Sequence, residues 1–128
     1  MTPDELKKRT KKFALDAIKL CDTLPHTRAG NVIASQLMRS ATSVGANYRA
    51  VCRARSKRDF VSKLGITLEE TDESIYWMEI LIESGMKTEQ HVSALMKEGD
   101  ELAAIFNASL HTARGQINQK SKIKDQKS

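Results

Sequence analysis

Apolar residues recur at steps of three and four positions along four long segments of this chain, residues 2–24, 27–51, 56–84 and 88–117. Such spacing gathers them on one side of an α-helix. A half-buried strand would need strict alternation, which no segment shows. Four amphipathic helices joined by short connections predict an all-α fold, an antiparallel up-down four-helix bundle.

The ends of these segments carry recognisable helix signals. Thr2 precedes Pro3 and lies three residues before Glu5, which predicts a capping box at the first helix. Ser56 is placed to cap the third helix, and Gly85 follows it at the position where helices stop. Thr88 is a further potential cap, so the sequence predicts where three of the four helices begin.

The predicted core consists of one stripe per helix. Each stripe faces the bundle interior at positions three or four residues apart. The predicted stripes comprise Leu6, Thr10, Phe13, Ala17, Leu20 and Leu24; Ile33, Leu37, Ser40, Val44, Asn47 and Val51; Val61, Leu64, Leu68, Thr71, Ile75, Met78 and Ile82; and Val92, Leu95, Gly99, Leu102, Phe106, Leu110, Ala113 and Ile117.

A chain of 128 residues with a formal charge of +5 is expected to form one domain. We assign the bundle to residues 1–118. Residues 119–128 are polar and rich in lysine, so we expect them to form a basic disordered tail that attracts polyanions at long range.

The N-terminus is charged at once and has no apolar region of the kind found in signal peptides. No apolar run approaches the ~20 residues needed to cross a bilayer. Cys21 and Cys52 lack a metal-type spacing, and we expect both to be buried free thiols in a reducing compartment. These features favour a cytoplasmic protein of bacterial type without membrane partners.

Charge is strongly segregated along the third helix and the joint before it. Residues 49–63 contain six basic residues and one acid, Asp59, whereas residues 64–84 contain six acids and no Lys or Arg. This order opposes the helix dipole, which favours acids at the start of a helix. An arrangement that local stability disfavours indicates a function, either for an anionic ligand or for a neighbouring subunit.

Nucleic acid is the anionic ligand that this basic cluster favours. Arginine suits bidentate phosphate contacts, and free amides at the start of the third helix add to the positive field. A plain solvated face is the commoner origin of such a charge run. The candidate phosphate-binding residues are Arg49, Arg53, Arg55, Lys57, Arg58 and Lys63, with Lys8 and Lys12 from the first helix. Few aromatic residues are available for base stacking, so we expect salt-sensitive phosphate contacts.

The third helix also carries a second apolar face around the only tryptophan, Trp77. At about 100° per residue, Trp77 points away from the predicted core stripe. This face predicts a subunit interface formed by Ile66, Glu70, Glu73, Trp77 and Leu81. The alternative is a central helix that is buried on all sides.

Along the second helix, Gln36, Ser40, Ser43 and Asn47 form a polar strip. Such residues at the edge of a core usually satisfy backbone groups or bond across helices, so we interpret the strip as structural. A ligand pocket around Asn47 is the alternative.

Neither a cofactor nor a catalytic centre is expected. Di-iron bundles need Glu-x-x-His pairs, which are absent, and the histidines are scattered. The six glycines form no phosphate-cradling loop, and no serine lies in a nucleophile elbow. We therefore predict a non-enzymatic protein without a metal site.

Two blocks of the sequence resemble a known family. The first reads QLMRSA at residues 36–41 and SVGAN at residues 43–47; the second comprises Phe60, Lys63, Leu64, Glu70 and residues 73–78, ESIYWM. They resemble the four-helix-bundle proteins encoded in intervening sequences of bacterial 23S ribosomal RNA genes. One departure is Ala50-Val51, where many members have Glu-Gly.

The resemblance implies a bundle that assembles as a ring, with five subunits the expected number. The chain is also similar to the accessory variability determinant of diversity-generating retroelements, a basic pentamer that binds nucleic acid and a reverse transcriptase. By that similarity Arg49, Arg53 and Arg55 are expected to face a polyanion. We expect a ring-forming scaffold that binds RNA or DNA, or alternatively an adaptor whose basic and acidic patches join subunits or a protein partner.

Overall fold

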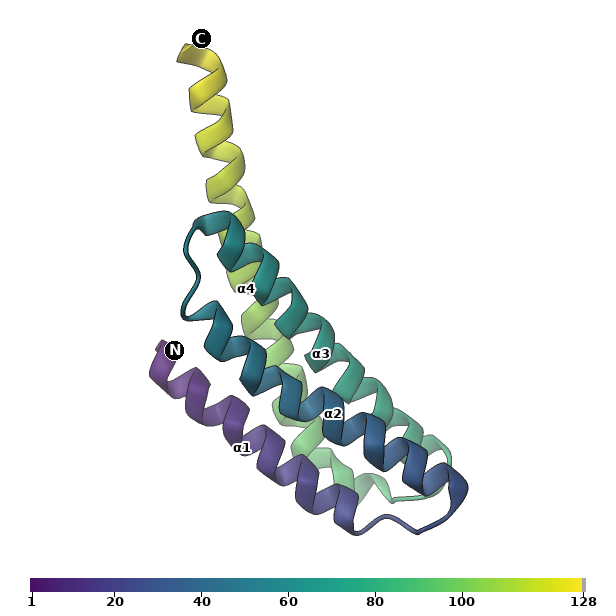
Figure 1. The fold of residues 1–128 in the computed structure, drawn as a ribbon. Coiled ribbons are helices and arrows are strands. Elements are labelled where there is room, and N and C mark those ends of the chain that lie inside the picture. Colours follow the sequence, from purple (N-terminus) through teal and green to yellow (C-terminus); the bar gives the residue numbers. More distant parts are fainter. Residues whose placement is uncertain (128) are drawn as a thin grey trace.

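The four expected helices are present in the computed structural model, which describes residues 1–127 and their side chains as far as Ile123 (Figure 1). They are α1 (Pro3–Asp22), α2 (Arg28–Val51), α3 (Lys57–Glu83) and α4 (Glu89–Lys127). Each runs antiparallel to the one before it, and the described residues contain no strand. The predicted all-α, up-down four-helix bundle is therefore confirmed.

Three of the predicted helix-end signals, Thr2, Ser56 and Gly85, are confirmed. Thr2 caps α1, its hydroxyl accepting from the Glu5 amide while the Glu5 carboxylate accepts from the Thr2 amide. Ser56 caps α3 by accepting from the Asp59 amide at 3.0 Å. Gly85 follows α3 with a φ of 77°, a left-handed conformation that favours glycine at this place.

The core lies between all four helices, with Phe13, Leu37, Leu64 and Phe106 almost fully buried. In the order of packing, α1 contacts α2, α2 contacts α3, and α3 contacts α4. The seam between α1 and α4 is much less extensive. One side of the bundle is therefore more open than the other three.

The buried face of α3 differs from the predicted stripe. Thr67, Ser74 and Leu81 are buried, whereas Val61, Leu68, Ile75 and Ile82 are only partly buried. The reason is that α3 lies between α2 and α4 and buries a wide face. The buried hydroxyls of Thr67 and Ser74 donate to the carbonyls four residues earlier, so polar residues are tolerated there.

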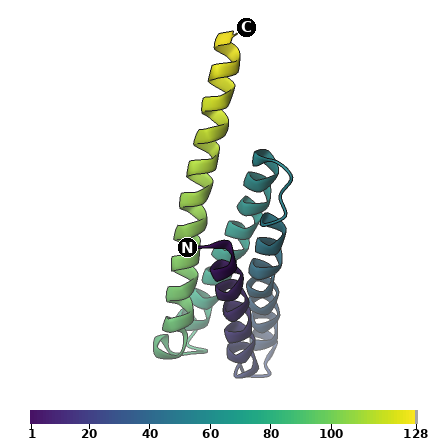
Figure 2. The same ribbon diagram turned by 90° about the vertical axis from the view of Figure 1, so that its left-hand side faces the viewer.

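The C-terminal segment also differs from expectation. We expected a disordered tail from residue 119, but α4 continues as a helix through Lys127 and projects beyond the α2–α3 loop (Figures 1 and 2). Lysine and glutamine have good helix propensity, and a helix extended from a packed segment needs no new nucleation. Ser128 lies outside the described residues.

Candidate nucleic-acid interface

The joint between α2 and α3 gathers the arginines in one groove. Arg49 is on the last turn of α2, and Arg53 and Arg55 follow in the connection. Together with Lys63 of α3 they line a shallow groove of about 590 Å³. In the described part of the chain none of these three arginines forms an ion pair, so their guanidinium groups are available to a ligand.

Asp59 holds this groove in shape. Its carboxylate accepts from the Lys63 ammonium at 2.8 Å and from the Arg55 backbone amide at 3.0 Å. These hydrogen bonds, that to Lys63 first, lower the pKa of Asp59. The pair therefore fixes the loop to the first turn of α3, and Lys63 is partly neutralised while the arginines are not.

The first helix extends this basic surface with residues other than those predicted. Lys7 and Lys11 line a neighbouring groove between α1 and α2 that also includes Arg49. Arg49 thus belongs to both grooves. We use the term basic surface for Lys7, Lys11, Arg49, Arg53, Arg55 and Lys63.

The predicted residues Lys8 and Lys12 line neither groove. Lys12 is bonded to Asp16 at 2.6 Å, and this hydrogen bond raises its pKa. It lines the opposite, α4-facing side of α1. One position along a helix turns a side chain by about 100°, which separates Lys7 and Lys11 from Lys8 and Lys12.

Two further members of the sequence cluster lie outside the two basic grooves, although Lys57 lines another groove together with Arg55. The Lys57 ammonium is 5.9 Å from the centre of the Phe60 ring, and both residues line a groove shared with α4. Arg58 is exposed at the start of α3 and lines neither basic groove. Lys57 thus lies between the α2–α3 joint and α4.

The predicted interface on α3 is organised by Arg39 of α2, which the sequence analysis did not single out. Its guanidinium pairs with Glu73 and, at 3.3 Å, with Glu70. The Trp77 indole donates to Glu73 at 3.1 Å. The sequence shows a basic residue on α2 and two acids on α3, but it does not show that they face each other. That depends on how α2 and α3 pack together.

Leu81 does not belong to that surface, which corrects its assignment to an oligomer interface. It is 0% exposed and lies in the core, while Ile66 and Tyr76 are 44% and 52% exposed. Trp77 is partly buried against the core. The outer face of α3 therefore presents Ile66, Tyr76 and part of Trp77 among acidic residues.

Each residue of the polar strip on α2 has a hydrogen-bond partner. Ser40 is fully buried and accepts from Ser74 of α3 at 3.0 Å. Ser43 donates to a backbone carbonyl, Asn47 donates to the Ser43 carbonyl, and Gln36 accepts from Arg39. This arrangement agrees with the structural interpretation of the strip.

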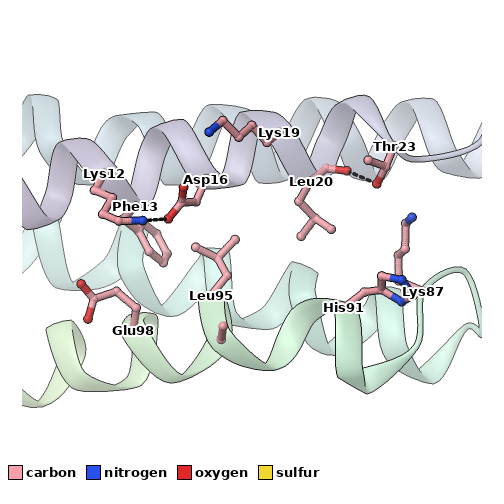
Figure 3. A pocket seen from close by; sticks show the side chains of 11 residues that line it. Lys12, Phe13, Asp16, Lys19, Leu20, Thr23, Lys87, His91, Leu95 and Glu98 are labelled. Carbon is pink, nitrogen blue, oxygen red and sulfur yellow. Dashed lines mark hydrogen bonds and ion pairs between the residues drawn. The ribbon is translucent and has the colours of Figure 1, made fainter.

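A second concavity, not anticipated from the sequence, lies in the open seam between α1 and α4 (Figure 3). Phe13 and Leu20 of α1 and Leu95 of α4 point into it, and its volume is about 560 Å³. Arg9 closes the seam on one side by pairing with Glu98 and Glu101. At this less extensive seam Leu20 and Leu95 are only partly buried, whereas Phe13 remains buried.

The cysteines differ from each other. Cys21 is buried, and burial raises the pKa of its thiol to about 11. Cys52, which we expected to be buried, is exposed because it is the C-cap of α2, at the edge of the bundle. Neither forms a disulfide.

The described residues form neither a metal-binding cluster nor a membrane-spanning helix. Among residues with described side chains, no group of three or more His, Cys, Asp or Glu could hold a metal ion. None of the helices, over their described residues, combines the length and the apolar character that a membrane crossing requires.

Comparison with known proteins finds a family model and solved structures that match this chain. A family model described as 23S rRNA-intervening sequence protein matches residues 4–108. A crystal structure of a protein of unknown function from the S23 ribosomal protein family of Bacteroides thetaiotaomicron is 30% identical. The match covers 82% of this chain and 97% of that one, with a TM-score of 0.76. No curated protein matched.

Proposed function

Because the chain belongs to the family of 23S rRNA-intervening sequence proteins, we propose that it is a non-enzymatic, ring-forming scaffold that binds nucleic acid through phosphate contacts. The observation that carries this proposal is the basic surface, in which the guanidinium groups of Arg49, Arg53 and Arg55 form no ion pair among the described residues. Unpaired guanidinium groups in a shallow groove suit a phosphate backbone.

Assembly would multiply the effect of a weak site. A ring, of five copies as the family resemblance implies, repeats the basic surface, so single contacts combine through avidity. The outer face of α3, with Ile66, Glu70, Glu73 and Trp77, is the proposed contact between subunits. We propose that the protein acts in the cytoplasm without a cofactor.

A second candidate function is favoured by the same acidic face. Glu69, Asp72, Glu79 and Glu83 are exposed around Tyr76, and such a surface fits a basic partner. In this reading the protein is an adaptor, whose acids meet the arginines of the next subunit or of a protein partner such as a reverse transcriptase.

A triple substitution separates the two candidates. We expect R49Q/R53Q/R55Q to weaken binding to a fluorescent nucleic acid at least about tenfold at 50 mM salt, and to reduce the slope of log K against log salt by about 2.7. The matched control K19Q/R28Q/K97Q removes three charges elsewhere and should bind much as the native chain does.

Mass measurement completes the test. If the arginine variant keeps its oligomeric mass and loses binding, the arginines contact the ligand. If its mass falls instead, they join subunits and the adaptor is favoured. Absence of binding by the native protein at micromolar concentration in low salt would contradict the leading proposal.

A further inference from the structure

The end of α4 forms a projecting basic arm, which we define as residues 114–127. α4 has 39 residues and α3, its packing partner, has 27. Ala113 is the last buried residue of α4, Ile117 is half-buried, and residues 118–123 are all exposed. The arm therefore extends past the bundle without a partner within the described chain (Figure 2).

The arm lies beyond the segment of this chain that the family model matches. The family model ends at residue 108, and the related crystal structure covers 82% of this chain while including 97% of its own. The arm thus lies outside the segment that the family model describes. Any function of the arm must therefore be inferred from its own residues.

The arm carries five basic residues and one acid, Asp125. No acid occurs from Leu102 to Lys124, whereas Arg114, Lys120, Lys122 and Lys124 all lie in this stretch. At about 100° per residue these four positions are distributed around the helix and do not form a single stripe. A helix with charge on several sides is suited to surroundings that are anionic on several sides.

The arm and the basic surface lie at the same end of the bundle. Ala113 and Gln116 of α4 share a groove with Lys57 and Phe60 at the start of α3. The α2–α3 loop, which carries Arg53 and Arg55, therefore lies near the base of the arm (Figure 1). A ligand lying across this end meets both sets of cations.

We infer that the arm inserts into the major groove of double-stranded DNA while the arginines of the α2–α3 joint contact the flanking phosphates. This inference rests on the proposed function and names its ligand. An α-helix of about 10–12 Å diameter fits the B-form major groove, about 12 Å wide. The A-form major groove of duplex RNA is too narrow for it, and single strands require stacking aromatics that the arm lacks.

The variant K120Q/K122Q tests the arm. Glutamine and lysine have similar helix propensity, so the helix is retained and circular dichroism should be unchanged. We expect binding to a DNA duplex of about 20 base pairs to weaken about tenfold, and the salt slope to fall by about 1.8. The control K19Q/K87Q removes two lysines at the opposite end of the bundle and should change binding less than about twofold.

A second experiment measures the affinity of the native chain for a DNA duplex, an RNA duplex and a single strand of the same sequence. We expect the DNA duplex to bind most tightly. Equal or tighter binding to the RNA duplex or the single strand would overturn the inference, as would equal binding by K120Q/K122Q and its control. Either result leaves the arginine-dependent proposal standing. Absence of binding to all three ligands would overturn the proposed function as well.

Discussion

At the residue scale, periodicity identifies which positions are apolar but not which neighbour each one meets. Leu81 and Ile66 fall on the same side of α3 when angles are counted from the predicted stripe, yet one is fully buried and the other 44% exposed. The difference arises because α2 and α4 cover α3 from two directions. An angle on a single helix cannot describe burial by two partners.

Leu81→Ala should therefore be costly. Removing a fully buried leucine loses transfer free energy and leaves a cavity, so we expect the free energy of unfolding to fall by about 2–5 kcal/mol. Leu15→Ala on the outer face of α1, where the side chain is 52% exposed, should change it by no more than about 0.5 kcal/mol. Urea denaturation measures both, and equal effects would contradict the assigned burial.

The two cysteines should also differ in how fast a thiol reagent modifies them. With the native protein near pH 8, dithionitrobenzoate should modify Cys52 rapidly, because that thiol is exposed, and should modify Cys21 only after unfolding. Mass spectrometry of the labelled peptides identifies the site. Rapid labelling of Cys21 in the folded chain would show that the α1–α2 packing opens readily.

The raised pKa of Cys21 also predicts a pH dependence. Above the ordinary value of 9.0 the unfolded chain loses this proton, while the folded chain keeps it up to about 11. Stability contributed by the buried thiol is thus complete below pH 9.0 and is lost as the pH rises through about 11. We therefore expect the free energy of unfolding to fall less between pH 9.0 and about 11 in Cys21→Ala than in the native chain. Unfolding curves of both proteins at several pH values measure this difference.

At the element scale, local signals position helix ends well. The Thr2 and Ser56 caps and Gly85 were predicted from residue type and spacing, and each depends only on atoms within one turn of the chain. The extension of α4 was missed because a lysine-rich segment is read as solvated coil, whereas attachment to a packed helix removes the nucleation cost.

Two glycines test how closely the elements approach one another. At Gly30 an added Cβ would lie 2.0 Å from the Pro25 carbonyl oxygen, so Gly30→Ala should destabilise the α1–α2 turn by about 1–3 kcal/mol. At Gly65 an added Cβ has no atom within 4 Å, so Gly65→Ala should stabilise α3 by about 0.5–1 kcal/mol. Thermal unfolding of both variants checks the opposite signs.

At the scale of the whole molecule, charge is divided between surfaces. The basic surface spans α1, α2 and the α2–α3 joint, while the acids of α3 lie on its outer face with exposed Ile66 and Tyr76. This separation allows the basic surface of one copy to contact the acidic face of the next. Such contacts between unlike surfaces form a closed ring when the rotation from each copy to the next divides a full turn evenly.

The double variant Ile66→Ser/Tyr76→Ser tests this contact. Both side chains are largely exposed, so the fold should persist while the mass measured by light scattering falls toward that of the 14.3 kDa chain. Leu15→Ser on the outer face of α1, also exposed, serves as the control and should leave the mass unchanged. An unchanged mass in the double variant would place the subunit contact elsewhere.

The sequence by itself determined the number of helices, most of their ends and the presence of concentrated basic charge, because these depend on neighbours within a few residues. Only the tertiary structure decided that Lys7 and Lys11 join Arg49, that Lys12 turns away to Asp16, and that Arg39 pairs with acids on α3. Those outcomes depend on the rotation of each helix about its axis, which is set by packing against two neighbours at once.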